Sequence, residues 1–162
     1  MSGSVEPAAA ADAPALAAVF LNCWRTAYRG IVDDEVIDRL DPSEVEARWE
    51  GLVAEHRVLV ARVDGAAVGM IRFGADDDDP TRGHVFSLYV DPSAAGRGVG
   101  GDLLARATAE LAAQYRTATL WVFAANERAL RFYRAAGWRP TGATRVEPEW
   151  RALELQLAVQ LS

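Results

Sequence analysis

The chain has 162 residues, of which 51% are hydrophobic and 25% charged, and its formal net charge is -6 at pH 7. These values predict one globular domain over residues 1–162, and the negative charge argues against a general binder of nucleic acid or anionic membranes. Cys23 is the only cysteine, which excludes an internal disulfide and suits a reducing cytoplasm. There is no signal-peptide pattern and no long apolar run, so we expect neither export nor membrane spanning.

The first half of the chain predicts a strand, three helices and a hairpin. A short strand at 5–8 precedes a helix that Asp12 caps and that runs to about Tyr28, with Gly30 placed to end it. Further helices are expected at 33–40 and 41–55. Strands at 58–63 and 67–73 are joined by Asp64-Gly65, a strong hairpin signal. The aspartate-rich segment 75–83 is expected to be a solvated loop.

A strand, a glycine-rich turn and a helix follow. Residues 84–90 are apolar, aromatic and β-branched, which predicts a strand buried on both faces. Asp91-Pro92 ends it. A loop of small residues spans 93–101, and apolar residues at helical spacing from 103 to 111 place the start of a helix near Val99 or Gly100.

The glycine turn has a chemical use. The first N–H groups of a helix have no intrahelical partner and carry partial positive charge, so glycines there let a phosphate or pyrophosphate approach. Arg97 adds a positive charge that would favour an anion. The alternative explanation of the glycines is that the turn serves only the tight packing of the strand against the helix. The turn lacks the Gly-Lys-Ser/Thr ending of a P-loop, and the next strand lacks the acidic residue of a dinucleotide fold.

The last third predicts a strand at 118–123, a helix at 127–136 capped by Asn126, and strands at 138–143 and 149–159 around a turn at Glu147-Pro148. A strand, helix and strand in succession require a parallel pair nearby. The fold class is therefore α+β, with a mostly antiparallel sheet, one central parallel pair and flanking helices.

Two segments together resemble the GNAT superfamily of acetyl-CoA-dependent N-acyltransferases. Residues 95–100 lie on the pyrophosphate loop that the family writes Q/R-x-x-G-x-G/A, with Ala95 in place of Gln or Arg. Residues 126–138 lie on its second motif, an Asn followed by a helix ending in aromatic-Tyr-x-x-x-Gly-aromatic. The resemblance implies a mixed sheet that splays open between the strands 84–90 and 118–123.

The resemblance also implies acetyl-CoA as co-substrate, with no metal. The backbone of the strand end would pair with the pantetheine arm, and the glycine turn would hold the pyrophosphate. Asn126 would contact the pantetheine or phosphate portion, with plain helix capping as the alternative; both roles are compatible. The expected cofactor-binding residues are Leu88, Tyr89, Val90, Gly96, Arg97, Gly98, Val99, Gly100, Gly101 and Asn126.

Tyr133 matches the family's tyrosine that protonates the departing thiolate. An amine attacking a thioester expels a basic thiolate unless a proton arrives, and the N–H of Val90 would polarise the carbonyl. The alternative for Tyr133 is a core aromatic with a satisfied hydroxyl. His84 is the candidate general base, with a surface histidine beside the aspartate-rich loop as the alternative. The strand 118–123 supplies no carboxylate for that role.

The expected acceptor is a small-molecule or peptide amine. Trp24, Tyr28 and Arg29, from the segment WRTAYRG, are its candidate binding residues, and core packing is the alternative for Trp24. The function predicted is therefore transfer of an acetyl group to a primary amine. A non-catalytic module that senses acyl-CoA is the alternative, and a homodimer through the final strand 149–159 is compatible with either.

Overall fold

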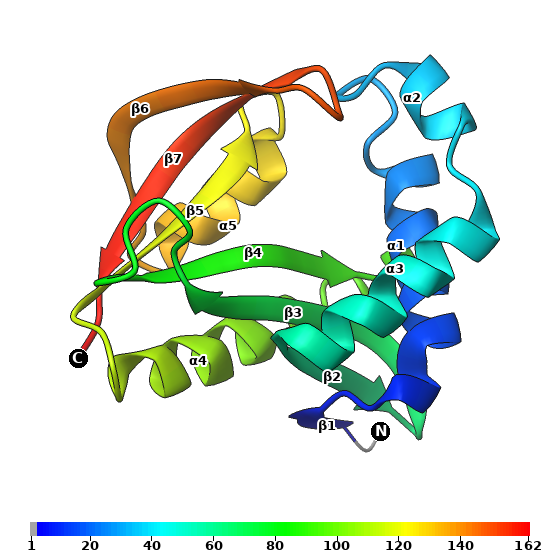
Figure 1. The fold of residues 1–162 in the computed structure, drawn as a ribbon, viewed down its shortest axis with the longest axis horizontal. Helices are drawn as coiled ribbons and strands as arrows, with labels where there is room; N and C mark the ends of the chain where they lie inside the picture. Colours follow the sequence, from blue (N-terminus) through cyan, green and yellow to red (C-terminus); the bar gives the residue numbers. More distant parts are fainter. Residues whose placement is uncertain (1–2) are drawn as a thin grey trace.

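The computed structural model describes residues 3–162, and a seven-stranded sheet in the order β1-β2-β3-β4-β5-β7-β6 forms its centre (Figure 1). All neighbouring strands are antiparallel except β4 and β5, which are parallel. The predicted fold class is confirmed. The strands are β1 (Gly3–Pro7), β2 (Arg57–Val63), β3 (Ala66–Ala75), β4 (Gly83–Val90), β5 (Thr117–Phe123), β6 (Arg139–Glu147) and β7 (Ala152–Gln160).

Helices cover both faces of the sheet. Successive strand residues point to opposite faces, so Val58 and Val60 of β2 pack with α1 and α3, while Leu59 and Ala61 pack with α4. No helix in the described range 3–162 is long and apolar enough to cross a membrane. The helices are α1 (Ala13–Thr26), α2 (Asp34–Asp38), α3 (Pro42–Glu55), α4 (Val99–Ala112) and α5 (Glu127–Ala135).

The sheet opens between its two central strands. The parallel pairing of β4 with β5 is limited to three residue pairs, Gly83–Ala118, His84–Thr119 and Val85–Leu120. Beyond Val85 the strands diverge, as the family resemblance implied. The expectation that the whole strand is buried on both faces is therefore wrong: its first residues are buried, but those from Phe86 to Val90 are half-buried because β5 no longer covers them.

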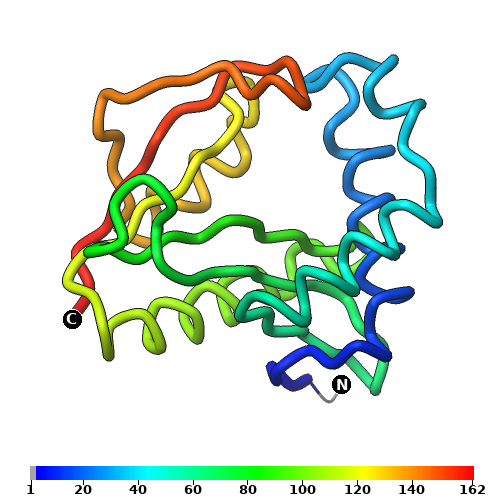
Figure 2. The backbone as a smooth tube through the Cα atoms, viewed as in Figure 1, coloured from blue at the N-terminus to red at the C-terminus, as the bar shows by residue number. Residues whose placement is uncertain are grey.

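The C-terminal hairpin reaches across the molecule to the N-terminal helices. Its turn spans residues 148–151, so β7 begins at Ala152 rather than at Glu149. Figure 2 shows the turn beside the chain that follows α1. Strand β7 pairs with β5 on one side and β6 on the other, so it is not the exposed edge we expected for dimerisation. The strands at the two edges of the sheet are β1 and β6.

Candidate functional site

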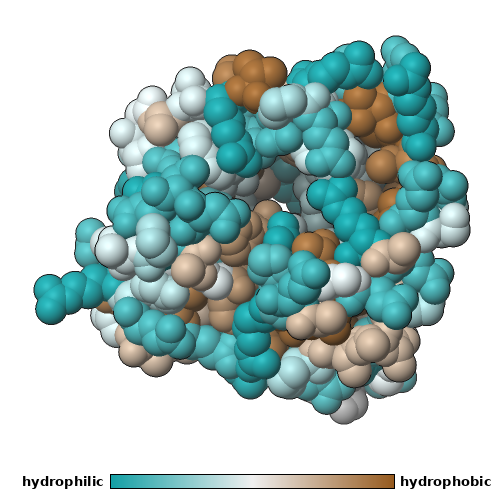
Figure 3. Space-filling model, in the orientation of Figure 1, coloured by the Kyte–Doolittle hydropathy of each residue, from teal (hydrophilic) through white to brown (hydrophobic). Residues whose placement is uncertain are grey.

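The open side of the sheet forms a cavity of about 380 Å³. Strands β4 and β5 line it on two sides, and α1, α3 and the turn between β6 and β7 complete its walls. Figure 3 shows a hollow near the middle of this face, bordered mainly by hydrophilic residues. The predicted site residues that line the cavity are Trp24, Tyr28, His84, Leu88, Tyr89, Asn126 and Tyr133.

The backbone of β4 presents free hydrogen-bonding groups toward β5. The N–H of Asp91 donates to the Val68 carbonyl at 2.7 Å, so Asp91 is a hydrogen-bonded position in the ladder with β3. These positions alternate, which commits the backbone of Tyr89 to β3 and turns that of Leu88 and Val90 to the open edge. The thiol of Cys23 donates to the Val90 carbonyl at 3.0 Å, leaving the Val90 N–H and both groups of Leu88 available.

The glycine turn leads directly into α4. Gly96 and Gly98 have φ angles of 80° and 79°, a left-handed conformation that glycine adopts without steric penalty. The N–H of Asp102 donates to the Gly98 carbonyl, so the N–H groups of residues 99–101 are the ones without an intrahelical partner. Arg97 instead lines a second cavity beside Ser4 and Arg62, next to β1 and β2. The turn thus has the local geometry of an anion site.

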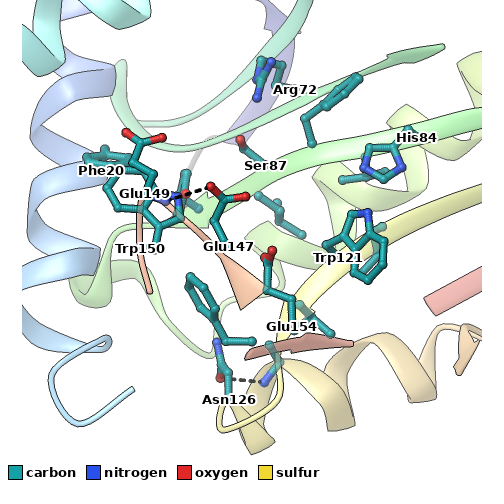
Figure 4. A pocket seen from close by; sticks show the side chains of 18 of the residues that line it. Phe20, Arg72, His84, Ser87, Trp121, Asn126, Glu147, Glu149, Trp150 and Glu154 are labelled. Carbon is teal, nitrogen blue, oxygen red and sulfur yellow. Dashed lines mark hydrogen bonds between the residues drawn. The ribbon is translucent and has the colours of Figure 1, made fainter. Parts of the chain in front are cut away.

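Helix α5 brings Asn126 and Tyr133 to the cavity. The Asn126 side chain accepts a hydrogen bond from the Ala129 N–H at 3.1 Å, which confirms the capping role (Figure 4). Tyr133 is 9% exposed and packs its ring against Phe132 and Trp138. The ring is part of the hydrophobic core, as the alternative for Tyr133 expected. The hydroxyl makes no hydrogen bond to another residue in 3–162, so it is available to a ligand in the cavity, and its role as an acid stays a prediction. Burial raises the pKa of Tyr133 well above its usual value, so the hydroxyl keeps its proton at neutral pH.

His84 is buried rather than superficial, which contradicts its interpretation as a surface histidine. It lies where β4 and β5 separate, and its Nδ1 is 2.7 Å from the Thr119 hydroxyl. That hydroxyl donates to the carboxylate of Asp76 at 2.8 Å. The Thr119 oxygen therefore accepts from the Nδ1–H of His84, which leaves Nε2 as the unprotonated nitrogen.

Most of the segment 75–83 is exposed, as expected of a solvated loop, but Asp76 belongs to the same buried network. Asp76 is only 4% exposed, and Arg82 donates to it at 2.7 Å. Burial tends to raise the pKa of Asp76, but hydrogen bonds from the Asp78 N–H, Thr119 and Arg82 outweigh it and lower the pKa overall. Burial lowers the pKa of His84 to about 4, against the attraction of the Asp76 carboxylate 3.6 Å away. Asp76 is thus ionised and His84 neutral at pH 7.

Sequence reasoning missed the carboxylates of the opposite wall. Glu154 in β7 is 8% exposed and accepts a hydrogen bond from Arg145 at 2.8 Å. The guanidinium of Arg145 also lies 4.4 Å from the centre of the Trp121 ring. Burial raises the pKa of Glu154 against the effect of Arg145. In Figure 4, Glu147 and Glu154 point toward the interior of the cavity. Leucines alternate with polar residues along 152–159, which places Glu154 on the polar face of the strand. The pattern does not reveal whether that polar face meets a cavity or the solvent.

The candidate acceptor residues separate into two groups. Trp24 is 1% exposed and Tyr28 contacts its ring edge-on, both at the cavity wall. Arg29 does not line the cavity, because its guanidinium pairs with Asp38 at 2.8 Å and Asp34 at 3.2 Å. Within residues 3–162, no group of three or more His, Cys, Asp or Glu side chains is arranged to hold a metal ion.

Comparison with known proteins identifies relatives of this chain. The model of the Acetyltransferase (GNAT) family matches residues 20–138. A probable N-acetyltransferase of Mycobacterium tuberculosis is 28% identical over 142 residues, covering 82% of this chain and 78% of the relative. Among solved structures, the PaiA N-acetyltransferase of Thermoplasma acidophilum in complex with coenzyme A superposes with a TM-score of 0.84 at 17% identity, covering 99% of both chains. The Salmonella typhimurium protein yncA, solved with its cofactor acetyl-CoA, has a TM-score of 0.74 at 22% identity, covering 100% of this chain and 95% of that one.

Proposed function

The chain belongs to the GNAT acetyltransferase family, and on that premise we propose that it transfers an acetyl group from acetyl-CoA to an amine. One observation carries the proposal. The open edge of β4 adjoins the glycine turn before α4, since a Cβ at Gly100 would lie 3.5 Å from Val90, and Tyr133 lines the cavity together with Leu88 of the same edge. The edge of β4 can pair with the amide groups of an extended ligand, and the glycine turn can bind an anion. The Tyr133 hydroxyl can donate a proton.

The residues present fit this co-substrate. The backbone of Leu88 and Val90 would pair with the amide groups of the pantetheine arm, as an added strand does. The free N–H groups of residues 99–101 would hold the pyrophosphate, and the Asn126 amide nitrogen, which its capping role leaves unused, would contact the arm. Acetyl-CoA would bring the activated thioester carbon to this opening.

In the proposed reaction the amine nitrogen bonds to the acetyl carbon as the carbon–sulfur bond breaks. Tyr133 gives its proton to the departing sulfur, and the base takes the proton that the amine loses, so charge is balanced on both sides. The N–H of Val90, at the open edge, would stabilise the negative charge on the carbonyl oxygen.

His84 is our candidate base. Its Nδ1–H is committed to Thr119, so Nε2 offers a lone pair to the amine directly or through water. The carboxylate of Glu154 is the second candidate, because burial raises its pKa and it points into the same cavity. Its hydrogen bond from Arg145 makes it a weaker proton acceptor.

A module that only senses acyl-CoA is the second function to consider. It would need the β4 edge and the glycine turn but no free proton donor in the cavity. The unpartnered Tyr133 hydroxyl favours catalysis. We also propose a cytoplasmic location, which accords with a single free and buried cysteine, Cys23.

The decisive experiment measures the midpoint of thermal unfolding with and without excess acetyl-CoA, with ATP and NAD as controls. At about 100 times its dissociation constant a ligand stabilises the folded state by about 2.7 kcal/mol, a shift on the order of 5–10 °C for this size. We expect the shift with acetyl-CoA only, followed by thiol release when amines are added. No shift with acetyl-CoA would refute the proposal, whereas a shift without thiol release from any amine would favour the sensing module.

A further inference from the structure

Arg72 differs from the other two arginines of the cavity in its partners. Arg48 pairs with Glu149 at 2.9 Å, and Arg145 pairs with Glu154 at 2.8 Å. Arg72, at the middle of β3, lines the same cavity but has no carboxylate within 4.0 Å in the described part of the chain. Among the residues that the structure describes, Arg72 is therefore the arginine of this cavity that forms no ion pair.

The surroundings of Arg72 add a hydrogen-bonding requirement. Its guanidinium carbon lies 4.7 Å from the centre of the Phe86 ring, and its Nε is buried without a hydrogen-bond partner. Nε1 of Trp24 lines this cavity too, but it interacts with the Tyr89 hydroxyl and so opposes the rise that burial causes in the pKa of Tyr89. The Nε of Arg72 is therefore the clearer case of a buried donor without an acceptor among residues 3–162. This atom can only donate a hydrogen bond, and a buried donor left without an acceptor destabilises the folded protein. An occupant with acceptor oxygens would remove that penalty.

The charges that line the cavity restrict which kind of anion could bind Arg72. Burial lowers the pKa of Arg72, with Arg48 acting in the same direction and Tyr89 and Asp77 against it, yet a guanidinium stays protonated at any working pH. A monoanionic carboxylate matches its planar fork of donors in a bidentate manner. A dianion such as a phosphate would meet more repulsion, because six carboxylates line the same cavity: Asp76, Asp77, Asp78, Glu147, Glu149 and Glu154.

Building on the proposed transferase function, we propose that the acceptor amine also carries a carboxylate, as a free amino acid does, and that Arg72 binds this carboxylate. Ser87 lies opposite Arg72 in the ladder of β3 with β4 and lines the cavity, so its hydroxyl is placed to add a hydrogen bond. The centre of the Phe86 ring lies 4.7 Å from the guanidinium carbon of Arg72 and 4.8 Å from the centre of the His84 ring. A short molecule is therefore long enough to reach from Arg72 to His84.

The opposite wall orients such a molecule. Glu147 and Glu154 point into the cavity from β6 and β7, whereas Arg72 comes from β3 (Figure 4). The carboxylates attract the amine end and repel the acid end, while Arg72 does the reverse. A diamine or polyamine lacking an acid group would leave Arg72 unpaired and would place a second positive charge near it. The two walls therefore select a zwitterion.

The test compares each of the twenty amino acids with its decarboxylated amine. Thiol release from acetyl-CoA is measured for wild type, Arg72→Gln, Arg72→Lys and a control, Arg57→Gln, which removes a surface ion pair with Glu110. We expect wild type to prefer at least one acid over its amine. Arg72→Gln should raise KM for that acid by about 10- to 100-fold, the range expected for a charged hydrogen bond, with kcat and acetyl-CoA affinity little changed. Arg72→Lys should recover part of the loss, and Arg57→Gln should match wild type.

A second measurement separates failure of this inference from failure of the transferase assignment. The unfolding midpoint is recorded with each amino acid, with and without coenzyme A. A shift by an acid in wild type but not in Arg72→Gln supports the role of Arg72 even if no thiol is released. If acetyl-CoA binds but no acid binds or reacts, or if Arg72→Gln weakens acids and decarboxylated amines equally, the inference is overturned while the cofactor assignment stands.

Discussion

Trp150, on the turn between β6 and β7, packs against Trp24 of α1 with their ring centres 4.5 Å apart. The contact joins the two ends of the chain across the cavity mouth. Arg48 of α3 reinforces it, since its guanidinium lies 5.6 Å from the Trp150 ring centre and pairs with Glu149. One wall of the cavity thus depends on a turn that is far from α1 in the sequence.

Replacing Trp150 with alanine should open this wall. We expect KM for the acceptor to rise by about tenfold while acetyl-CoA affinity stays the same, because the glycine turn at 96–101 does not line the cavity that Trp150 lines. Steady-state kinetics of thiol release would measure KM for the acceptor, and titration calorimetry would measure the affinity for acetyl-CoA. Val146→Ala on the same hairpin, where Val146 is 63% exposed, is the matched control and should behave as wild type. An unchanged KM in Trp150→Ala would show that the turn does not contact the acceptor.

The Tyr133→Phe variant removes only the hydroxyl from a ring that packs against Phe132 and Trp138. We expect kcat to fall by about 100-fold or more, the usual range for a lost general acid, with acetyl-CoA affinity within about threefold of wild type. Single-turnover rates together with equilibrium binding would separate the two effects. Equal losses in both would refute the role as acid and indicate a contact made in the ground state.

His84 and Glu154 can be ranked as bases by their glutamine variants. If His84 accepts the amine proton, His84→Gln should lower kcat by about 100-fold and Glu154→Gln by much less. Both variants should bind acetyl-CoA normally, since neither residue is among those proposed to hold it, namely the backbone of Leu88 and Val90, residues 99–101 and Asn126. The thiol-release rate at saturating acetyl-CoA is the measurement. The reverse ranking would transfer the role to Glu154.

The pH dependence of stability offers an independent test of the buried histidine. The folded-state pKa of His84 is about 4, below the usual 6.5, so the unfolded chain takes up a proton between these values that the folded chain does not. The stabilising effect is complete above pH 6.5 and is lost as pH falls toward 4, by about 3 kcal/mol in all. Urea unfolding of wild type and His84→Gln at several pH values should show wild type losing more stability over this window. Parallel curves would mean that His84 titrates normally.

The glycine turn can be tested with two substitutions at one position. A Cβ at Gly100 would lie 3.5 Å from the Phe132 ring and 3.5 Å from Val90, ordinary contact distances. Gly100→Ala should therefore fold and bind acetyl-CoA. Gly100→Glu should abolish binding, because it adds bulk and a negative charge where the pyrophosphate is expected. Calorimetric titration of both variants decides the matter, and binding by Gly100→Glu would overturn the assignment of the turn.

Local patterns in the sequence determined the elements and the cofactor side of this site. The hairpin at Asp64-Gly65, the turn holding Gly96 and Gly98, and the cap at Asn126 depend on a few neighbouring residues each, and the structure has all three. A strand, a glycine turn and a helix in direct succession stay together in space because short connections hold them. The sequence therefore predicted the fold class and the likeness to the GNAT family.

Only the tertiary structure decided the part of the cavity that we propose binds the acceptor. The burial of His84, the network of Asp76 with Thr119, and the partners of Glu154 depend on residues that separate elements bring together. A charged residue in an alternating strand has the same local pattern whether its face meets water or a cavity. Whether Arg72 lacks a carboxylate partner is likewise a property of the folded molecule, because it depends on the charges that every surrounding element places around one guanidinium.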